Sequence, residues 1–390
     1  MGTTKKCGIL ILNYNGRELL EECLLSIIEA ASNSENECEV VMIDNHSSDN
    51  SVSFVEETFP MVKIFKLREN RYLFSYNDII FNSSYDYVIL LNNDIAVKAG
   101  FIDPLLKHFD RHNVFAIGCK MLSWNKRILS VSRRIGKFNK GIFYNQSSMV
   151  TENPGYSLYI SGAAVAYNRR KFCELGGFDD LYLPWGVEDL DICYRAWKRG
   201  WKSIYEPKSI VYHKSSASLK KVSTTTQRKI ILTKNHFLLY WKNVTDRKLI
   251  FQHWVFLFPS LIKACLHRDW IYLKGFWLAL RQLREVLRKR SMNNLLNQLS
   301  DEEICMLSQR DTIDQIELKR VAYIHNKFPT LSETFVLNEI NLLEKMGFEI
   351  ICFSLYPFAE KVIHKEAKQW LSKTVYVNSL LSFKLLVAHL

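Results

Sequence analysis

The amino-acid sequence predicts an α/β fold with a mainly parallel sheet over about residues 5–213. Short apolar segments alternate there with helix-like or polar segments, which favours strand–helix–strand units. Several apolar segments lack polar alternation, and such runs are typical of strands that helices cover on both faces. Clusters of Asn, Asp and Ser follow some of these segments, at the strand ends where an open α/β sheet places its ligands.

We expect strands in this first region at 7–13 (CGILILN), 39–45 (EVVMIDN), 62–67 (VKIFKL), 86–92 (DYVILLN), 114–122 (VFAIGCKML), 158–168 (LYISGAAVAYN) and 209–213 (SIVYH). From about 214 to 300 the sequence has several helix-like runs and no strand-like run, so we expect a helical appendage. A capping signal, Ser300-x-x-Glu303, predicts a new helix at its end.

From about residue 320 the pattern becomes strand, helix and strand again. VAYIHN and EIICFSLYP are the expected strands, and FPTLSETFVLNEINLLEKMGF supplies a loop and a helix between them. About 70 residues are too few for a doubly wound domain, so we expect an incomplete βαβ unit, from a fragment or a truncated module. The predicted parts are 1–215, 216–315 and 316–390.

The composition excludes several classes of protein. A chain of 390 residues with 48% hydrophobic and 24% charged residues and no low-complexity tract is not disordered, collagenous or a solenoid. The nine cysteines are scattered and never form a CxxC pair, which argues against a disulfide framework or a structural zinc site and favours a reducing compartment. The first apolar run is too short for a signal peptide, so we expect a cytoplasmic protein.

Positive charge is concentrated in the helical region. Residues 214–290 hold 17 Lys and Arg and three acidic residues, and the whole chain carries a net charge of +12. Because this region is also rich in Trp, Phe and Leu, it suits an anionic membrane surface better than nucleic acid. Its most apolar stretch, 249–266, contains Gln252, His253 and Lys263, so we do not expect a transmembrane helix. The alternative is a soluble helical pair whose aromatic residues pack in the core.

The first two strand ends carry candidate binding groups. The first strand ends in NYNG, with Asn13 and Asn15, and the second in DNHS, with Asp44, Asn45 and Ser47. An Asp at such an edge can accept hydrogen bonds from a base N–H or from ribose hydroxyls. The serine can equally cap the following helix.

Two later clusters carry acids. The strand 86–92 runs into Asn92-Asn93-Asp94, whose oxygens suit a hard divalent cation, although a simple turn explains the same residues. Farther on, Glu188 shares a helix face with Asp191 and Arg195, an arrangement that can be only an ion-pair stripe.

Asp189 points away from this stripe, and a carboxylate near a helix start can act as a general base if it faces a cleft. The last strand ends at His213. Taken alone, this histidine is more often a packed or surface residue than a ligand.

The order of these motifs is more specific than any one of them. NYNG, VVMIDNHSSDNS, LLNNDIAV, SGAAVAYNRR, LGGFDDLYLPWGVEDLDICYRAWKRGW and VYH together resemble the family 2 glycosyltransferases of the GT-A fold, over about residues 5–215. Within that family the chain looks most like the bacterial rhamnosyltransferase-type enzymes that build surface polysaccharides. The motifs do not specify the sugar.

The resemblance implies roles for the matching residues. Asn13 and Asn15 would lie in the first nucleotide-binding loop, and Asp44 would contact the uracil or thymine ring, with Asn45 and Ser47 nearby. The remaining members of the implied donor-binding set are Asn77, Asn92 and Asn93.

The resemblance also implies a metal site and a catalytic base. Asp94 matches the last acid of the DxD-type motif and would hold Mn²⁺ or Mg²⁺ on the diphosphate, and His213 matches a further metal ligand. Asp189 matches the catalytic base, and Glu188 is its neighbour and the reserve candidate.

Two positions depart from the family pattern. Asn92 stands where the metal motif often has its first Asp, and a neutral amide oxygen lowers metal affinity unless diphosphate and water complete the shell. In ENRYLFSYN, Tyr72 and Leu73 stand where the family usually has Gly followed by Phe, which can reshape the loop beside the sugar pocket.

Residues 320–357 resemble the opening of the family 4 glycosyltransferases of the GT-B fold, in which SETFVLNE follows the first strand. The alternative is that any βαβ opening shares this pattern. The donor-binding half of a GT-B enzyme lies in its C-terminal domain, which the chain lacks, so we expect no complete second activity.

The sequence therefore predicts an inverting glycosyltransferase that moves a sugar from a nucleotide-diphosphate sugar to a hydroxyl of a glycan or lipid-linked acceptor. We expect no nucleic-acid partner, and we expect peripheral contact with the inner face of the cytoplasmic membrane. A catalytically inactive membrane-docked scaffold is the alternative. A nucleotidyltransferase is disfavoured because no Gly-rich loop with Lys or Arg follows the first strand to bind a triphosphate.

Overall fold

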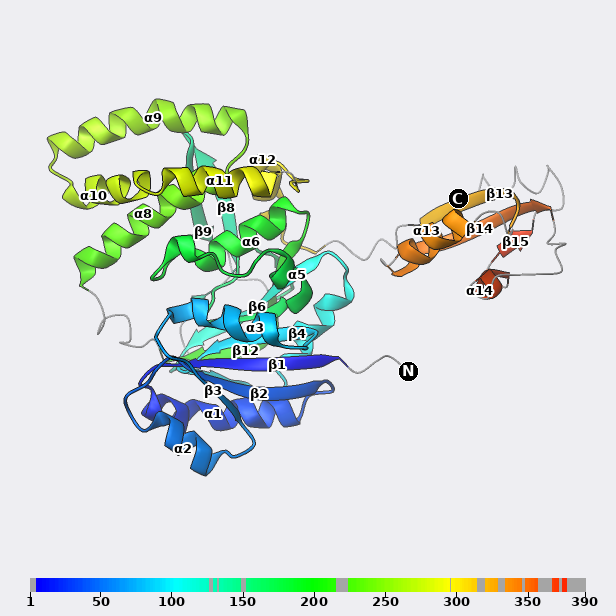
Figure 1. Cartoon of the computed structure of the whole chain (residues 1–390), viewed down its shortest axis with the longest axis horizontal. Helices are drawn as coiled ribbons and strands as arrows, with labels where there is room; N and C mark the ends of the chain where they lie inside the picture. Colours follow the sequence, from blue (N-terminus) through cyan, green and yellow to red (C-terminus); the bar gives the residue numbers. More distant parts are fainter. Residues whose placement is uncertain are drawn as a thin grey trace. The chain divides into compact units, whose positions relative to one another are not determined.

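The computed structural model of the chain divides into two compact units, Met1–Ile313 and Asp314–Leu390 (Figure 1). It describes residues 5–125, 129–131, 133–148, 152–214, 224–294, 296–313, 320–328, 334–345, 348–356, 367–371 and 374–376. The predicted helical region belongs to the first of these units.

The first unit is built around one large mixed sheet. Its strand order is β10-β12-β6-β11-β4-β1-β2-β3, with β5 beside β12 and β7 beside β6. The strands are β1 Lys6–Asn13, β2 Glu37–Asp44, β3 Lys63–Lys66, β4 Tyr87–Asn92, β5 Ile95–Val97, β6 Val114–Ser123, β7 Leu129–Val131, β10 Gly155–Tyr156, β11 Ala164–Asn168 and β12 Lys202–His213.

The prediction of a mainly parallel sheet is confirmed for its longest strands. Strand β1 runs parallel to β2 and β4, β2 to β3, and β6 to β12. Strand β11 runs antiparallel between β4 and β6. An apolar run shows that a strand is buried but not its direction, so this reversal could not be read from the sequence.

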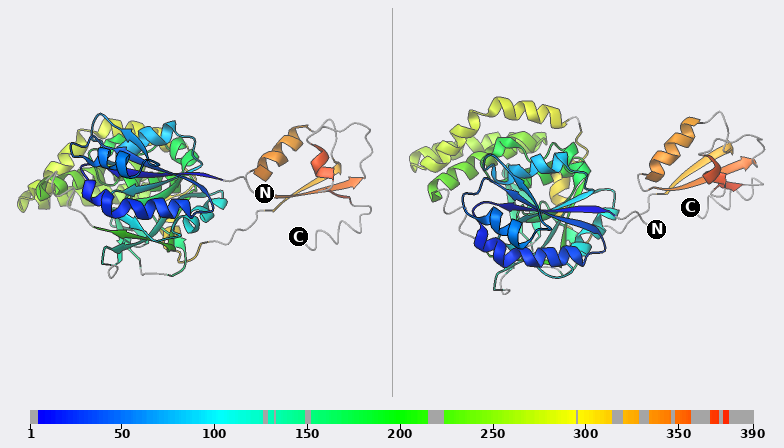
Figure 2. Two further views of the ribbon diagram at one scale, coloured as in Figure 1. Left: turned by 90° about the horizontal axis from the view of Figure 1, so that it is seen from below. Right: turned by 60° about the horizontal axis from the view of Figure 1, so that its bottom comes forward.

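Helices lie on both faces of the sheet (Figure 2). In the first part of the chain they are α1 Arg17–Ser32, α2 Ser51–Thr58, α3 Ser75–Asn82, α4 Ile102–Leu106, α5 Arg169–Glu174 and α6 Glu188–Lys198, with short 3₁₀ turns η1 Tyr72–Phe74, η2 Lys107–Asp110 and η3 Asp180–Tyr182. Helix α1 shows how they pack, since Leu20, Leu24 and Ile27 recur on one face and are buried.

A hairpin of β8 Arg134–Asn139 and β9 Ile142–Ser147 was not expected from the sequence. Its strands mix polar and apolar residues, so neither forms an apolar run. Lys140 and Gly141 both have positive φ at the turn, as a two-residue type I′ hairpin turn requires.

The helical region was predicted, and its described residues contain α8 Thr225–Asn243, α9 Arg247–Leu266, α10 Trp270–Leu280, α11 Leu283–Asn294 and α12 Asp301–Ser308. The capping box of Ser300 and Glu303 is present at the start of α12. Helix α9 is long and apolar enough to cross a membrane by length and composition alone, with 22% of its most apolar window buried.

The second unit contains β13 Arg320–Lys327, α13 Thr334–Lys345, β14 Glu349–Tyr356, α14 Lys368–Leu371 and β15 Thr374–Tyr376. Strands β13, β14 and β15, which lie in the described part of this unit, are parallel and follow that order beside a small core that includes Ile340, Cys352 and Trp370. The predicted βαβ opening is thus present. Ser332 and Glu333 of the SETFVLNE run lie outside the described residues.

Candidate active site

The carboxyl ends of β1, β2 and β4 lie next to one another, which brings the predicted binding residues together. Asn13 is the direct partner of Asp44 across the β1–β2 ladder. On the other side of β1, Leu12 is the partner of Asn92. Polar groups at these three ends therefore share one edge of the sheet.

Asn13 is the centre of a hydrogen-bond network at this edge. Its fully buried amide nitrogen lies 3.2 Å from Asp44 Oδ1, 3.2 Å from Ser47 Oγ and 2.9 Å from Ser51 Oγ. Its amide oxygen accepts a hydrogen bond of 2.8 Å from Asn93. Because the amide is buried and engaged on both sides, Asn13 organises the loop around it.

We call Asn13, Asp44, Asn45 and Ser47, which the sequence predicts to bind the nucleotide, the nucleotide end of the site. Asp44 accepts a hydrogen bond from the Ser47 backbone N–H through Oδ2. Asn45 donates to the Tyr72 carbonyl at 3.1 Å and accepts from the Ser75 hydroxyl. These bonds connect the end of β2 to the loop before α3.

Asn15 adopts a positive φ of 48° and ties the β1 loop to the β2 loop. Its side-chain oxygen accepts hydrogen bonds from the backbone of Ser48 at 2.7 Å and Asp49 at 3.3 Å. Asp49 in turn accepts from the backbone of Arg17 and Ser51, at the starts of α1 and α2. Asp49 therefore acts as a structural cap for two helices.

Asp94 and His213 lie close together just beyond the carboxyl end of β4. His213 Nε2 lies 3.2 Å from Asp94 Oδ2, and the Asp94 carbonyl accepts from the Lys214 backbone N–H. Strand β12 brings them together because it pairs with β5, the strand that follows Asp94. One carboxylate and one imidazole are donor types that a divalent cation accepts. Among the described residues, no group of three or more His, Cys, Asp or Glu could hold a metal, so this pair would be part of a shell.

Glu188 and Asp189 begin helix α6. Asp189 keeps partial solvent exposure and accepts hydrogen bonds from the backbone N–H of Gly162 at 3.2 Å and Leu190 at 2.7 Å. Burial raises the pKa of the Asp189 carboxyl. Glu188 is 5% exposed, its Oε2 accepts no hydrogen bond from a described residue, and burial together with the Asp189 charge raises its pKa to about 8.

Asp191 is surrounded very differently. It is fully buried, and it accepts from Arg195 Nε at 2.7 Å, Tyr182 at 2.7 Å and Asn243 at 2.7 Å. Despite burial, which acts to raise it, the pKa of Asp191 is lowered by the charges of Arg195 and Lys242. The predicted ion pair of Asp191 and Arg195 is therefore present, while Glu188 is not part of it.

Asn77 of α3 forms hydrogen bonds with the GGFDD segment. Its amide donates to the Phe178 carbonyl at 2.8 Å and accepts from the Phe178 backbone N–H at 2.9 Å. These bonds fasten the GGFDD segment to α3. Both sides of the amide are engaged, and a role for Asn77 in donor binding stays a prediction.

Two known protein families match parts of this chain. Residues 8–172 match the family described as Glycosyl transferase family 2, and residues 143–216 match the N-terminal domain of galactosyltransferase. This part of the chain is a family 2 glycosyltransferase domain. Both matches end before α8.

Relatives of this glycosyltransferase are distant. The chain is 24% identical over 238 residues to N-acetylglucosaminyl-diphospho-decaprenol L-rhamnosyltransferase of Mycobacterium tuberculosis, covering 54% of this chain and 76% of that enzyme. It is 23% identical to N-acetylgalactosaminyltransferase 6 of Drosophila melanogaster, covering 53% of this chain and 33% of the fly enzyme.

Among solved structures, GalNAc-T7 with UDP, GalNAc and Mn²⁺ is similar with a TM-score of 0.51 and 18% identity, over 63% of this chain and 49% of that one. At this identity the likeness supports the GT-A fold. The chain is thus a glycosyltransferase whose residues 8–172 match family 2 and lie in a unit with the GT-A fold.

The loop that departs from the family pattern keeps a glycine-like backbone. Tyr72 has a φ of 54°, in the left-handed region that glycine adopts most easily. Asn45 holds the Tyr72 carbonyl, and Leu73 packs close to Gly162. Tyr72 therefore adopts the left-handed backbone conformation that a glycine would adopt most easily.

Sequence reasoning missed several groups that shape this glycosyltransferase site. Gly162 was within a recognised motif, but nothing in the sequence showed that its N–H would bind Asp189. Asn235, Lys242 and Asn243 on α8 contact the segment 179–191 from about 50 residues away. No local spacing signals a contact of this kind.

Proposed function

We propose that the enzyme transfers a sugar from a nucleotide-diphosphate sugar to an acceptor hydroxyl by a single displacement with inversion. Asp189 would accept the hydroxyl proton as the oxygen attacks the anomeric carbon, and the nucleoside diphosphate would leave. The contrast between Asp189 and Asp191 carries this proposal. Asp191 is neutralised by buried cations, whereas Asp189 is partly exposed, has a raised pKa and, among the described residues, accepts hydrogen bonds from backbone N–H groups alone.

Asp94 and His213 fit a role in holding Mn²⁺ or Mg²⁺, because their donor atoms already lie 3.2 Å apart at the sheet edge. A bound cation would stabilise negative charge on the diphosphate leaving group. The remaining ligands would come from the diphosphate and water. Asn92 and Asn93 would contribute neutral contacts, and Asn93 is already held by Asn13.

We further propose that the acceptor is a glycan or lipid-linked glycan used in bacterial surface polysaccharide synthesis. The rhamnosyltransferase relative is named for an acceptor on decaprenol, which supports this choice. We keep the family 4 interpretation of residues 320–357 as a prediction, because both family matches lie before residue 217.

The outer face of α9 supports a membrane-associated location. Phe251, Val255, Phe258, Ile262 and Leu266 follow one another at helical spacing, and all are exposed. The buried residues of α9 lie on the opposite face. With the positive charge of the region, such a face suits the anionic inner surface of the cytoplasmic membrane.

Hydrolysis of a panel of UDP-, GDP- and dTDP-sugars with Mn²⁺ tests the proposed activity. We expect slow release of nucleoside diphosphate from one donor class, and loss of that release in Asp189→Asn. No release from any donor, with or without added glycan acceptors, would favour the inactive scaffold instead.

Co-sedimentation with phosphatidylglycerol vesicles tests the membrane proposal. We expect the double variant Phe258→Ser/Leu266→Ser to lose most of the vesicle binding that wild type shows. The control variant Leu25→Ser, at an exposed leucine of α1, should keep it. Equal recovery of all three proteins in the supernatant, at low and high salt, would contradict the proposal.

A further inference from the structure

We propose that helix α8 is part of the catalytic apparatus, and that its residues Asn235 and Lys242 are positioning residues for Asp189, the proposed catalytic base. This inference rests on the proposed role of Asp189. It goes beyond the family comparison, because α8 lies outside both matched regions. The segment that α8 holds is residues 182–191, which we call the acid turn.

The acid turn contains a backbone conformation that needs support. Val187 has a φ of 68°, and Gly186 before it has a φ of 97°. A positive φ is common for glycine but strained for a β-branched residue, and such strain persists only where surrounding contacts impose it. Val187 directly precedes Glu188 and Asp189, so its conformation sets where helix α6 begins and where Asp189 points.

Asn235 supplies support on the N-terminal side of the turn. Its side chain is fully buried, and its amide nitrogen lies 2.9 Å from each of the carbonyl oxygens of Tyr182, Trp185 and Gly186. The preceding residue, Lys234, donates to the Leu183 carbonyl at 3.1 Å. One turn of α8 therefore binds the carbonyls that lead into Val187.

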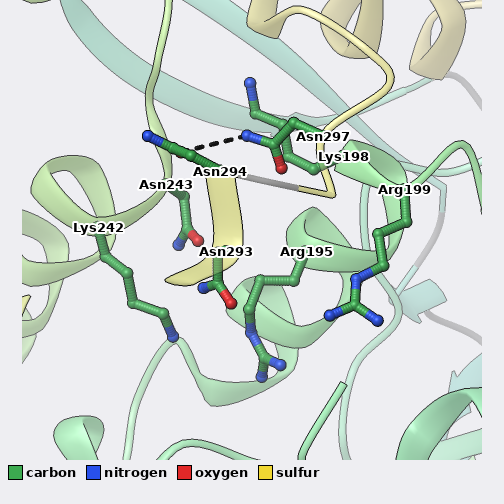
Figure 3. Close-up of a pocket in the computed structure, with 8 residues that line it drawn as sticks. All are labelled: Arg195, Lys198, Arg199, Lys242, Asn243, Asn293, Asn294 and Asn297. Carbon is green, nitrogen blue, oxygen red and sulfur yellow. Dashed lines mark hydrogen bonds between the residues drawn. The ribbon is translucent and has the colours of Figure 1, made fainter. Parts of the chain in front are cut away.

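Lys242 supplies support on the C-terminal side. Its ammonium group lies 2.6 Å from Asp179 Oδ2 and 2.9 Å from both carboxylate oxygens of Asp191. Asn243 adds a hydrogen bond of 2.7 Å to Asp191. Figure 3 shows Lys242 and Asn243 projecting from α8 beside Arg195 of α6. Asp191 is thereby fixed two residues after Asp189.

The two contacts have a shared effect on Asp189. Asn235 lies seven residues before Lys242, so both side chains project from the same face of α8. Asn235 bonds to the acid turn before Val187, and Lys242 bonds to it after Val187. Among the described residues, Glu188, Arg134, Tyr159, Tyr167 and Cys193 are near enough for their charges to interact with that of Asp189, and none of these five comes from α8. Helix α8 therefore acts through the position of the turn and not through direct contact.

Hydrogen–deuterium exchange on the full chain tests this inference without requiring activity. We compare Lys242→Met and Asn235→Ser with Lys229→Met, which makes the same chemical change at an exposed position of α8. We expect exchange to rise in residues 182–191 for the first two variants and to stay unchanged in β1 and β2. Unchanged exchange in the acid turn, or an equal rise throughout the first unit, would overturn the inference.

Kinetics with the donor found in the hydrolysis panel provide the second readout. We expect Lys242→Met to lower kcat at least tenfold while the donor KM changes less than twofold, and Lys242→Arg to restore part of kcat. A kcat within twofold of wild type would overturn the inference. If Lys242→Met does not fold, Asn235→Ser decides by the same criteria. If wild type hydrolyses no donor, the proposed function fails, and the exchange data alone decide the role of α8.

Discussion

The nucleotide end and the acid turn of this glycosyltransferase are stabilised in different ways. At the nucleotide end, neutral amides and hydroxyls from neighbouring strand ends bond to one another and to nearby backbone, as Asn13 and Asn45 show. At the acid turn, the buried carboxylate of Asp191 is matched by cations, and one of those cations, Lys242, comes from a helix distant in sequence. The first arrangement follows from sheet register, whereas the second depends on the packing of α8.

The largest expected effect is a loss of kcat on changing Asp189, the acid that differs from Asp191 in having no cation partner among the described residues. Asp189→Asn keeps the shape of the side chain but removes the proton acceptor, so we expect kcat to fall by about 10²- to 10⁴-fold. Binding of UDP or GDP, measured by calorimetry, should be unchanged because the nucleotide end is untouched. A variant that keeps more than about a tenth of wild-type kcat would show that Asp189 is not the base.

Asp191→Asn should act on stability first. Removing this carboxylate leaves the buried charge of Arg195 without its carboxylate partner and leaves Lys242 with Asp179 alone, and breaking such a network typically costs about 3–5 kcal/mol. We expect a loss of this size in the free energy of unfolding, measured with urea. Asp180→Asn is the control, since it removes an exposed ion pair with Arg71 and should cost less than about 1 kcal/mol. Equal losses in both variants would contradict the distinction.

Glu188 should make the free energy of unfolding fall as the pH rises. Its pKa is raised to about 8 in the folded protein, so the folded state favours the protonated form. This contribution is complete below the ordinary pKa of glutamate and is lost as the pH rises through about 8. Glu188→Gln removes the effect, and its stability relative to wild type should rise by a few kcal/mol between pH 5 and pH 9. A difference that is constant with pH would contradict the assignment.

Asp94→Ala should produce the smallest of these effects, and only when metal is present. The change removes the only carboxylate of Asn92-Asn93-Asp94, so we expect UDP or GDP affinity in Mn²⁺ to fall about tenfold or more. Asn92→Asp should increase it. Affinity measured with EDTA serves as the control and should be equal in all three proteins. Identical Mn²⁺ titrations for wild type and Asp94→Ala would remove the metal assignment.

Parts of the site that lie on consecutive strand ends could be predicted well. Asn13, Asp44 and Asn92 were expected at one edge, and the ladders place them there. Tyr72 was noted as a departure, but its left-handed conformation was not foreseen. The hairpin β8–β9 was missed because its strands have no continuous apolar face. Hydrophobic pattern reports burial, so elements that are half polar give little signal.

The sequence by itself determined the α/β class, the positions of the main strands along the chain, the helical middle region and the set of candidate acids. It could do so because apolar periodicity and turn chemistry are local properties of the chain. Helical spacing already predicted that Asp191 pairs with Arg195 and that Asp189 points away, whereas the tertiary structure alone decided that Asp191 also receives a second cation. That second cation is Lys242, whose contact with α6, like that of Asn243, is created by folding across about 50 residues.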